Sequence, residues 1–173
     1  MTTLVFKYIY KLIPDAYHGT SLEAANKILE EKKFIPGRGE DLFLGDGSYF
    51  YEGNLDRAKT WAQKRNEGRA IGVLQVSIEL GIFLDLNNPD HQRKLAASRT
   101  ELERKEGKQL NPTWVINAVA RIYKVDTIRA TIRRRMHIML SDFPVDMSEI
   151  IVCLRNPERI SNIEMVYRGV FRR

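Results

Sequence analysis

Residues 17–52 read YHGTSLEAANKILEEKKFIPGRGEDLFLGDGSYFYE and carry the clearest helix, loop and strand signals of the chain. Apolar residues spaced for one helical face are Leu22, Ala25, Ile28 and Leu29. Thr20 followed by Glu23 forms a capping-box pattern at the start of that helix. A loop rich in glycine and proline follows, and the glycine turn at 45–47 leads into an aromatic strand. The stretch therefore predicts a strand, a helix, a loop and a second strand.

The rest of the chain continues this mixture of helical and strand patterns. Helices are predicted at 55–65, from 112 onward and at 127–140, with a surface helix or a mobile insertion at 89–106. Further strands are predicted at 3–10, 70–79, 82–86, 149–155 and 163–168. No internal repeat or flexible linker divides the sequence, so residues 1–173 are expected to form a single α+β domain.

The composition narrows the class of protein. Hydrophobic residues make up 43% and charged residues 29%, a balance typical of globular proteins. No apolar run approaches the roughly 20 residues needed to cross a bilayer, so a membrane partner is not expected. The lone cysteine, Cys153, excludes an internal disulfide and favours a reducing cytoplasm. The histidines show no metal-ligand spacing, and no metal is expected.

Positive charge is concentrated in the second half of the chain. Residues 1–86 carry 11 Lys and Arg against 12 Asp and Glu, whereas residues 87–173 carry 17 against 10. The densest cluster includes Arg129, Arg133, Arg134 and Arg135. Such a cluster either attracts phosphate backbones or acidic partners, or forms the solvated face of a helix.

Two glycine-containing segments are candidates for ligand binding. His18 ends an extended segment, and Gly19 beside it would let a ligand approach the backbone closely. Tyr49 and Tyr51 share one face of a strand, which suits a flat cationic ring that stacks on tyrosine. Taken alone, each segment can also be interpreted as an ordinary turn whose histidine or tyrosines belong to the core.

A third candidate is Glu149, which opens the apolar strand at 149–155. Acidic residues are depleted in strands, so the placement is unusual. Glu149 either faces solvent or accepts a hydrogen bond from a ribose hydroxyl and stabilises positive charge. Other acidic residues that compete for this role are Asp142, Asp146 and Glu158.

In this order, the three segments resemble the ADP-ribosyltransferase superfamily, in the branch of diphtheria toxin and the poly(ADP-ribose) polymerases. That branch is identified by a His-Tyr-Glu triad. Its first motif matches His18-Gly19-Thr20, and its second, Gly-x-Gly-x-Tyr-Phe followed by a helix with small residues, matches residues 45–50 with Ala58 and Ala62. Glu149 is the choice for the third motif.

The resemblance implies two packed, mostly antiparallel sheets that form a central NAD cleft with flanking helices. His18, Tyr49 and Glu149 would be catalytic: His18 would bind a ribose hydroxyl, Tyr49 would stack on the nicotinamide, and Glu149 would hold the 2′-hydroxyl and stabilise the sugar cation. The second wall of the nicotinamide site would be Tyr51 or Trp61. The residues implied for NAD⁺ binding are His18, Gly19, Thr20, Gly47, Tyr49, Tyr51 and Trp61.

The resemblance further implies transfer of ADP-ribose from NAD⁺ to a macromolecular acceptor by a short bacterial toxin or phage-defence effector, with an antitoxin protein as a further partner. The basic residues favour a nucleic-acid acceptor, such as RNA, over a protein. They are Arg129, Arg133, Arg134 and Arg135. The helical, basic segment 87–147 has no counterpart in the shared motifs and is expected to hold the acceptor specificity.

Two alternatives stay open. The RNA 2′-phosphotransferase also begins with Tyr-His-Gly-Thr, but it uses a second histidine flanked by arginines where this chain reads FLGDGSYFYE. The second alternative is a non-catalytic module of the same fold that binds nucleotide or nucleic acid. A DNA-binding protein would also explain the charge, yet no helix-turn-helix or zinc pattern supports it.

Overall fold

The computed structural model describes residues 12–140 and 143–170, and for 133–140 and 143–147 it describes the backbone alone. The strand predicted at 3–10 lies outside the described residues. The elements in chain order are β1 (Leu12–Ser21), α1 (Leu22–Glu31), β2 (Ser48–Glu52), α2 (Leu55–Arg65), β3 (Ala70–Glu79), β4 (Phe83–Asp85), α3 (Pro89–Glu106), α4 (Pro112–Ile122), β5 (Thr127–Leu140), β6 (Phe143–Leu154), a 3₁₀ turn (Pro157–Arg159) and β7 (Ile160–Val170). Within these ranges, none of the helices is long and apolar enough to cross a membrane.

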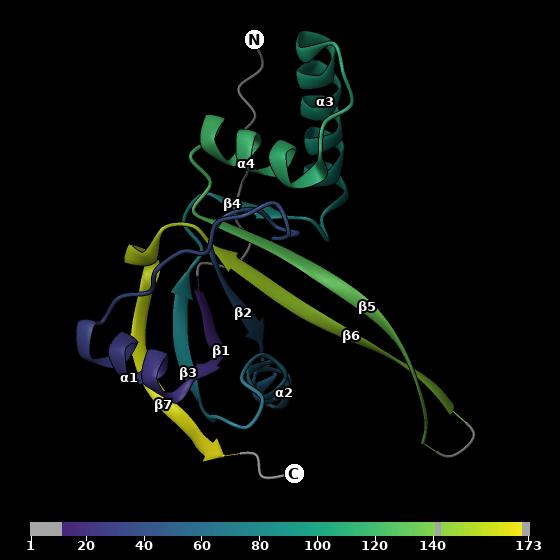
Figure 1. Ribbon diagram of the computed structural model, residues 1–173. Helices are drawn as coiled ribbons and strands as arrows, with labels where there is room; N and C mark the ends of the chain where they lie inside the picture. Colours follow the sequence, from purple (N-terminus) through teal and green to yellow (C-terminus); the bar gives the residue numbers. More distant parts are fainter. Residues whose placement is uncertain (1–11, 141–142, 171–173) are drawn as a thin grey trace.

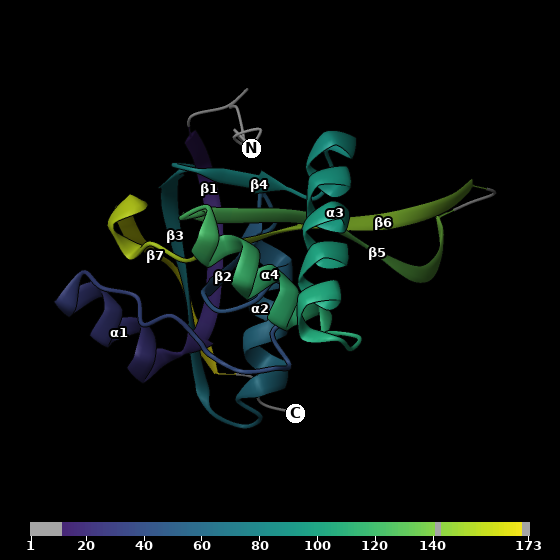
Figure 2. The same cartoon turned by 90° about the horizontal axis from the view of Figure 1, so that it is seen from above.

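The architecture is α+β, built on a seven-stranded mixed sheet in the order β4-β5-β6-β2-β1-β3-β7 (Figure 1). The β4–β5 pair is parallel, and the other neighbours are antiparallel. Helices α3 and α4 stand together at the end of the molecule near β4. Helices α1 and α2 lie on opposite sides of β1 and β3, as Figures 1 and 2 show from two directions.

The sheet forks between β1 and β2. These two strands pair at only two register positions, Ala16 with Glu52 and Tyr17 with Tyr51. Beyond them, residues 18–21 pair with β3 and residues 48–50 pair with β6. The resemblance implied two packed sheets, whereas the described residues form one seven-stranded sheet whose strands separate into two arms at this fork. We call β1, β3 and β7 the first arm, and β2, β6, β5 and β4 the second arm.

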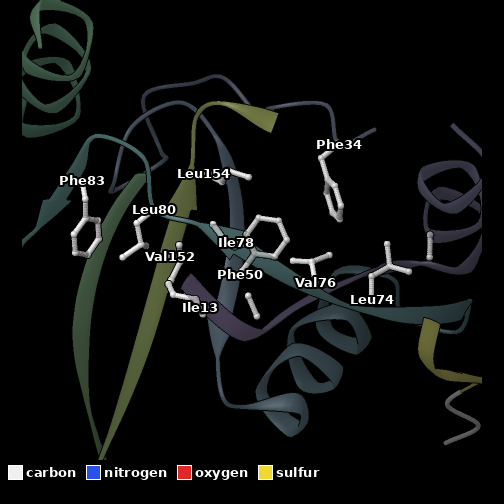
Figure 3. Packing of buried hydrophobic residues seen from close by; sticks show 12 residues of the cluster. Ile13, Phe34, Phe50, Leu74, Val76, Ile78, Leu80, Phe83, Val152 and Leu154 are labelled. Atoms are coloured by element: carbon white, nitrogen blue, oxygen red, sulfur yellow. The ribbon is translucent and has the colours of Figure 1, made fainter. Parts of the chain in front are cut away.

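Small residues let the helices approach the first arm closely. A Cβ atom added to Gly19 of β1 would lie 2.0 Å from the carbonyl oxygen of Ala58 in α2. A Cβ added to Gly72 of β3 would lie 2.7 Å from the side chain of Ala25 in α1. One apolar cluster includes Tyr51 and Ala58, and the second, shown in Figure 3, includes Phe34 and Phe50.

Most of the helix starts follow the sequence signals. Asn54 caps α2 through its side chain, and Asn111 caps α4 with a proline at the first helical position. The cap of α1 is Ser21, whose hydroxyl accepts from the Ala24 amide at 3.2 Å, and not Thr20 as predicted. The predicted segment 89–106 is a helix throughout.

The helix predicted at 127–140 is wrong, because this segment is strand β5. It pairs antiparallel with β6 from Thr127 to Leu140. Asp126, which directly precedes this segment, accepts a hydrogen bond from the Ile82 amide at 2.7 Å. Threonine and isoleucine in TIRATI are suited to a strand, and long-range pairing decided the outcome over the local pattern. Beyond the body of the sheet, β5 and β6 continue as a two-stranded hairpin (Figure 1).

Candidate functional site

A cavity of about 500 Å³ lies at the fork, a volume within the range of small-molecule sites. Its walls come from β1, α1, the following loop, β2, α2 and one residue each of β5 and β6. The residues predicted for NAD⁺ binding all line it, namely His18, Gly19, Thr20, Gly47, Tyr49, Tyr51 and Trp61. Segments of β1, β2 and α2 thus meet at one place.

His18 connects the two arms across the fork. Its Nδ1 lies 2.8 Å from the carbonyl oxygen of Tyr49. A carbonyl oxygen can only accept, so Nδ1–H donates, and Nε2 of the neutral ring is left as an acceptor. The ring packs edge-on against Phe34 at 5.4 Å and against Phe50 at 5.5 Å. Burial lowers the pKa of His18, so the neutral ring that this arrangement requires is favoured at pH 7.

Tyr49 lines the cavity, and its hydroxyl is engaged within the protein. The hydroxyl donates to the carbonyl oxygen of Gly45 at 2.8 Å and accepts from the Leu44 amide at 3.0 Å. Burial raises the pKa of Tyr49 well above its usual value, so the phenol stays protonated. Phe43 packs beside the ring with centroids 5.6 Å apart. The aromatic face, and not the hydroxyl, is therefore what Tyr49 offers a ligand.

The glycine turn that holds Tyr49 is fixed by two residues that sequence reasoning missed. Asn117 of α4 accepts from the Asp46 amide through its side-chain oxygen at 2.8 Å. Arg155, just after β6, donates to the Asp46 carbonyl and to the same Asn117 oxygen, both at 2.8 Å. Gly45 has a φ of 79°, which a residue with a side chain rarely adopts. No local signal could identify partners 71 and 109 residues distant.

Glu149 is buried and does not face solvent. Its carboxylate lies 2.5 Å from Nε of Arg57, with the two side chains only 3% and 17% exposed. Its cross-strand partner Ile132 and its same-face neighbour Ile151 both line the cavity, whereas Glu149 itself is outside the lining. Arg57 stands in the first turn of α2 and was not predicted.

Of the three acidic residues that compete with Glu149 for the third motif, only Glu158 has a described side chain. Glu158 is exposed and belongs to the short 3₁₀ turn, away from the cavity lining. Asp142 and the side chain of Asp146 lie outside the described residues.

Trp61 is a rim residue, and Tyr51 is an enclosed one. Trp61 leaves 41% of its surface exposed, while Tyr51 leaves 8%. The guanidinium of Arg65, one turn further along α2, lies 5.1 Å from the centre of the Trp61 ring. Trp61 and Arg65 both line the cavity. Tyr51 is thus the better placed of the two for an enclosed wall.

The predicted basic cluster is not the face of a helix. The Arg129 guanidinium contacts Glu52 at 2.6 and 2.9 Å and Asp85 at 3.5 Å. It lines a second cavity together with His91, whose Nδ1 accepts from the Asp85 amide at 2.9 Å. The side chains of Arg133, Arg134 and Arg135 lie outside the described residues. In the described ranges, no group of three His, Cys, Asp or Glu residues is placed to hold a metal ion.

The chain is 26% identical to an uncharacterized protein of Methanocaldococcus jannaschii over 186 aligned positions, which cover 86% of this chain and 85% of that protein. No protein-family model matches the chain. No solved structure matches it.

Proposed function

We propose that this chain is an ADP-ribosyltransferase, with the fold of that superfamily, which transfers ADP-ribose from NAD⁺ to a macromolecular acceptor. The observation that carries the proposal is the meeting of His18 and Tyr49, 31 residues apart, in one cavity where the first bonds the backbone of the second. These are the two residue types that the resemblance requires for the ribose and the nicotinamide.

The backbone of β1 supports nicotinamide binding at Gly19. The Asp15 carbonyl accepts from the Gly53 amide at 2.8 Å, so the backbone groups of Asp15 point toward β2. Alternation along an antiparallel strand turns those of Gly19 to the same side, where β2 has already separated. They are suited to hold the carboxamide while the Tyr49 ring stacks on the nicotinamide. Nε2 of His18 accepts from a ribose hydroxyl.

The reaction breaks the bond between ribose C1′ and the nicotinamide nitrogen, and the bonding electrons leave with nicotinamide. The acceptor's lone pair forms the new bond to C1′, and the acceptor gives up a proton. Because nicotinamide leaves readily, the protein mainly positions the sugar and stabilises its developing positive charge. Glu149 is the residue proposed to bind the 2′-hydroxyl, and Arg57 holds its carboxylate in place.

The biological role that we propose is a toxin or phage-defence effector in a reducing cytoplasm, restrained by an antitoxin protein. It rests on the resemblance to short members of the superfamily and on the lone cysteine. Incubation of cell extract with labelled NAD⁺, followed by separate nuclease and protease digestion, identifies the acceptor class. We expect label that nuclease alone removes.

Nicotinamide release from NAD⁺, measured with the purified chain in the presence of extract, tests the activity itself. His18→Ala, Tyr49→Ala and Glu149→Gln should each lower the rate roughly 10²- to 10³-fold. Tyr49→Phe keeps the ring and loses only the hydroxyl that closes the turn, so it should retain far more activity than Tyr49→Ala. Tyr123→Phe, outside the cavity lining, is the matched control. A wild-type chain that releases no nicotinamide overturns the proposal.

A further inference from the structure

The exposed tryptophan of α2, Trp61, is not needed for the enclosed wall of the proposed nicotinamide site, because Tyr51 is better placed for that wall. An aromatic side chain with 41% of its surface in water gains free energy when a partner covers it. Trp61 is on the rim of the cavity in which NAD⁺ would react. Whatever covers Trp61 is therefore held at the mouth of this cavity.

The residue next to Trp61 adds a cation to this surface. Arg65 follows Trp61 by four positions, which places both on one helix face, and its guanidinium lies 5.1 Å from the ring centre. Both residues line the cavity. An aromatic ring with an adjoining arginine is the combination on which single-stranded nucleic acids bind, because bases stack on the ring and phosphates meet the cation.

The charges of α2 favour a polyanion. The helix carries four cations, Arg57, Lys59, Lys64 and Arg65, and one acidic residue, Asp56. Arg57 is engaged by Glu149, and Lys59 lies 3.1 Å from Asp56 and 4.9 Å from the centre of the Tyr167 ring. Lys64 and Arg65 remain exposed in the last turn, adjacent to Trp61.

We infer that α2 binds a single-stranded nucleic acid, with a base stacked on Trp61 and phosphates neutralised by Arg65 and Lys64, and that this strand is the acceptor of the proposed reaction. The inference rests on the proposed function, for which it names the acceptor and its site. Arg129, the described member of the cluster first predicted for this role, is engaged by Glu52 and Asp85. A duplex is excluded as the favoured ligand because its base faces are already stacked.

The fluorescence of Trp61 tests the binding directly. The chain has two tryptophans, so Trp114→Phe leaves Trp61 as the single reporter. A short single-stranded oligonucleotide should quench this fluorescence in a saturable manner that weakens with added salt. The duplex of the same sequence should bind at least tenfold more weakly. No quenching, or equal quenching by the duplex or by an acidic peptide, overturns the inference.

Anisotropy of a labelled oligonucleotide gives a second readout. Trp61→Ala should weaken binding roughly 5- to 150-fold, the range expected for loss of one stacked base. Arg65→Ala should weaken it about tenfold. Arg93→Ala, which removes an exposed arginine from α3, should leave affinity unchanged. Equal losses in the Arg65 and Arg93 variants would mean that net charge alone drives binding and would refute the stacking site.

Neither measurement contains NAD⁺, so the two proposals fail separately. A chain that releases nicotinamide but does not bind the oligonucleotide refutes the α2 site and leaves the proposed function standing. A chain that binds the oligonucleotide through Trp61 without any nicotinamide release refutes the acceptor role and the proposed function, while the binding site itself remains.

Discussion

His18 donates to the second arm through Nδ1–H and offers Nε2 to a ligand as an acceptor, and this second role requires a neutral ring. Burial lowers its pKa, and the same holds for His91, which accepts from a backbone amide. Protonation would convert the accepting nitrogen of either ring into a donor, and the hydrogen bond that it accepts would be lost.

The stability of the protein should therefore fall on acidification below pH 6.5. In that range the unfolded chain takes up protons that the folded chain refuses, so the free energy of unfolding decreases by up to about 1.4 kcal/mol per pH unit for each histidine. Urea unfolding between pH 7.5 and 5 measures this slope. His18→Asn and His91→Gln should each reduce it. An increase in stability toward pH 5 would contradict the assignment.

Arg57 and Glu149 should show strong energetic coupling. Removing either partner of a buried ion pair leaves an uncompensated charge, which typically costs about 3–5 kcal/mol. The double variant Arg57→Leu, Glu149→Leu should be less destabilised than the two single changes added together. A double-mutant cycle by chemical denaturation measures the coupling, and simple additivity would show that the pair contributes nothing as a pair.

Individual site residues could be predicted from the sequence where they belong to short motifs of adjacent residues. His18, Gly19 and Tyr49 stand in short motifs, and the structure brings them to one cavity. Arg57, Asn117 and Arg155 act through contacts with distant segments, and ordinary helical or strand positions carry no mark of such contacts.

Among the elements, helix α2 packs closely on β1 because residue 19 is a glycine and has no side chain. Gly19→Ala would bring a methyl group against the backbone carbonyl of Ala58, which cannot rotate away. The helix must shift, and we expect a loss of about 2 kcal/mol or more, within the range of overpacked cores. Gly37→Ala, where the nearest atom is 3.4 Å away, should cost far less. Thermal unfolding of both variants checks this, and equal effects would contradict it.

The contact between α4 and the glycine turn should influence NAD⁺ use. Asn117→Ala removes the acceptor shared by Asp46 and Arg155, so the turn that seats Tyr49 loses one of its supports. We expect KM for NAD⁺ to rise about tenfold, a cost of roughly 1.4 kcal/mol. Arg121→Ala, an exposed change on the same helix, is the control. Equal KM values would show that α4 does not support the site.

Prediction of the elements succeeded where the local pattern agreed with the long-range pairing of the segment. Helix 55–65 and strand 70–79 agree with α2 and β3 at both ends. Segment 127–140 was wrong because its strand state depends on β6, which begins after it in the chain. The residue pattern of one segment does not show which distant strand the segment will pair with.

In the whole molecule, the cavity lies at the fork, so a ligand bound there would contact both arms of the sheet. Neither the strand order nor the change of partner between β1 and β2 could be read from the sequence, because both arise from long-range pairing. A dinucleotide in the cavity would touch β1 on one side and β2 on the other.

NAD⁺ should therefore raise the melting temperature. Glu149→Gln is suited to this measurement because it is expected to consume the ligand roughly 10²- to 10³-fold more slowly. At 100 times the dissociation constant, binding stabilises the folded state by about 2.7 kcal/mol. Adding His18→Ala to that variant should reduce the shift, and adding Arg93→Ala should not. An unchanged melting temperature at millimolar NAD⁺ would contradict binding in the cavity.

Cys153 lies beneath the glycine turn, and a Cβ on Gly47 would come within 2.5 Å of its sulfur. It is the single cysteine of the chain and is buried, and burial raises the pKa of its thiol to about 12. Alkylating reagents need a thiolate and access, so they should react only when the turn lifts away. The rate of covalent tagging at this sulfur therefore measures how often the glycine turn opens.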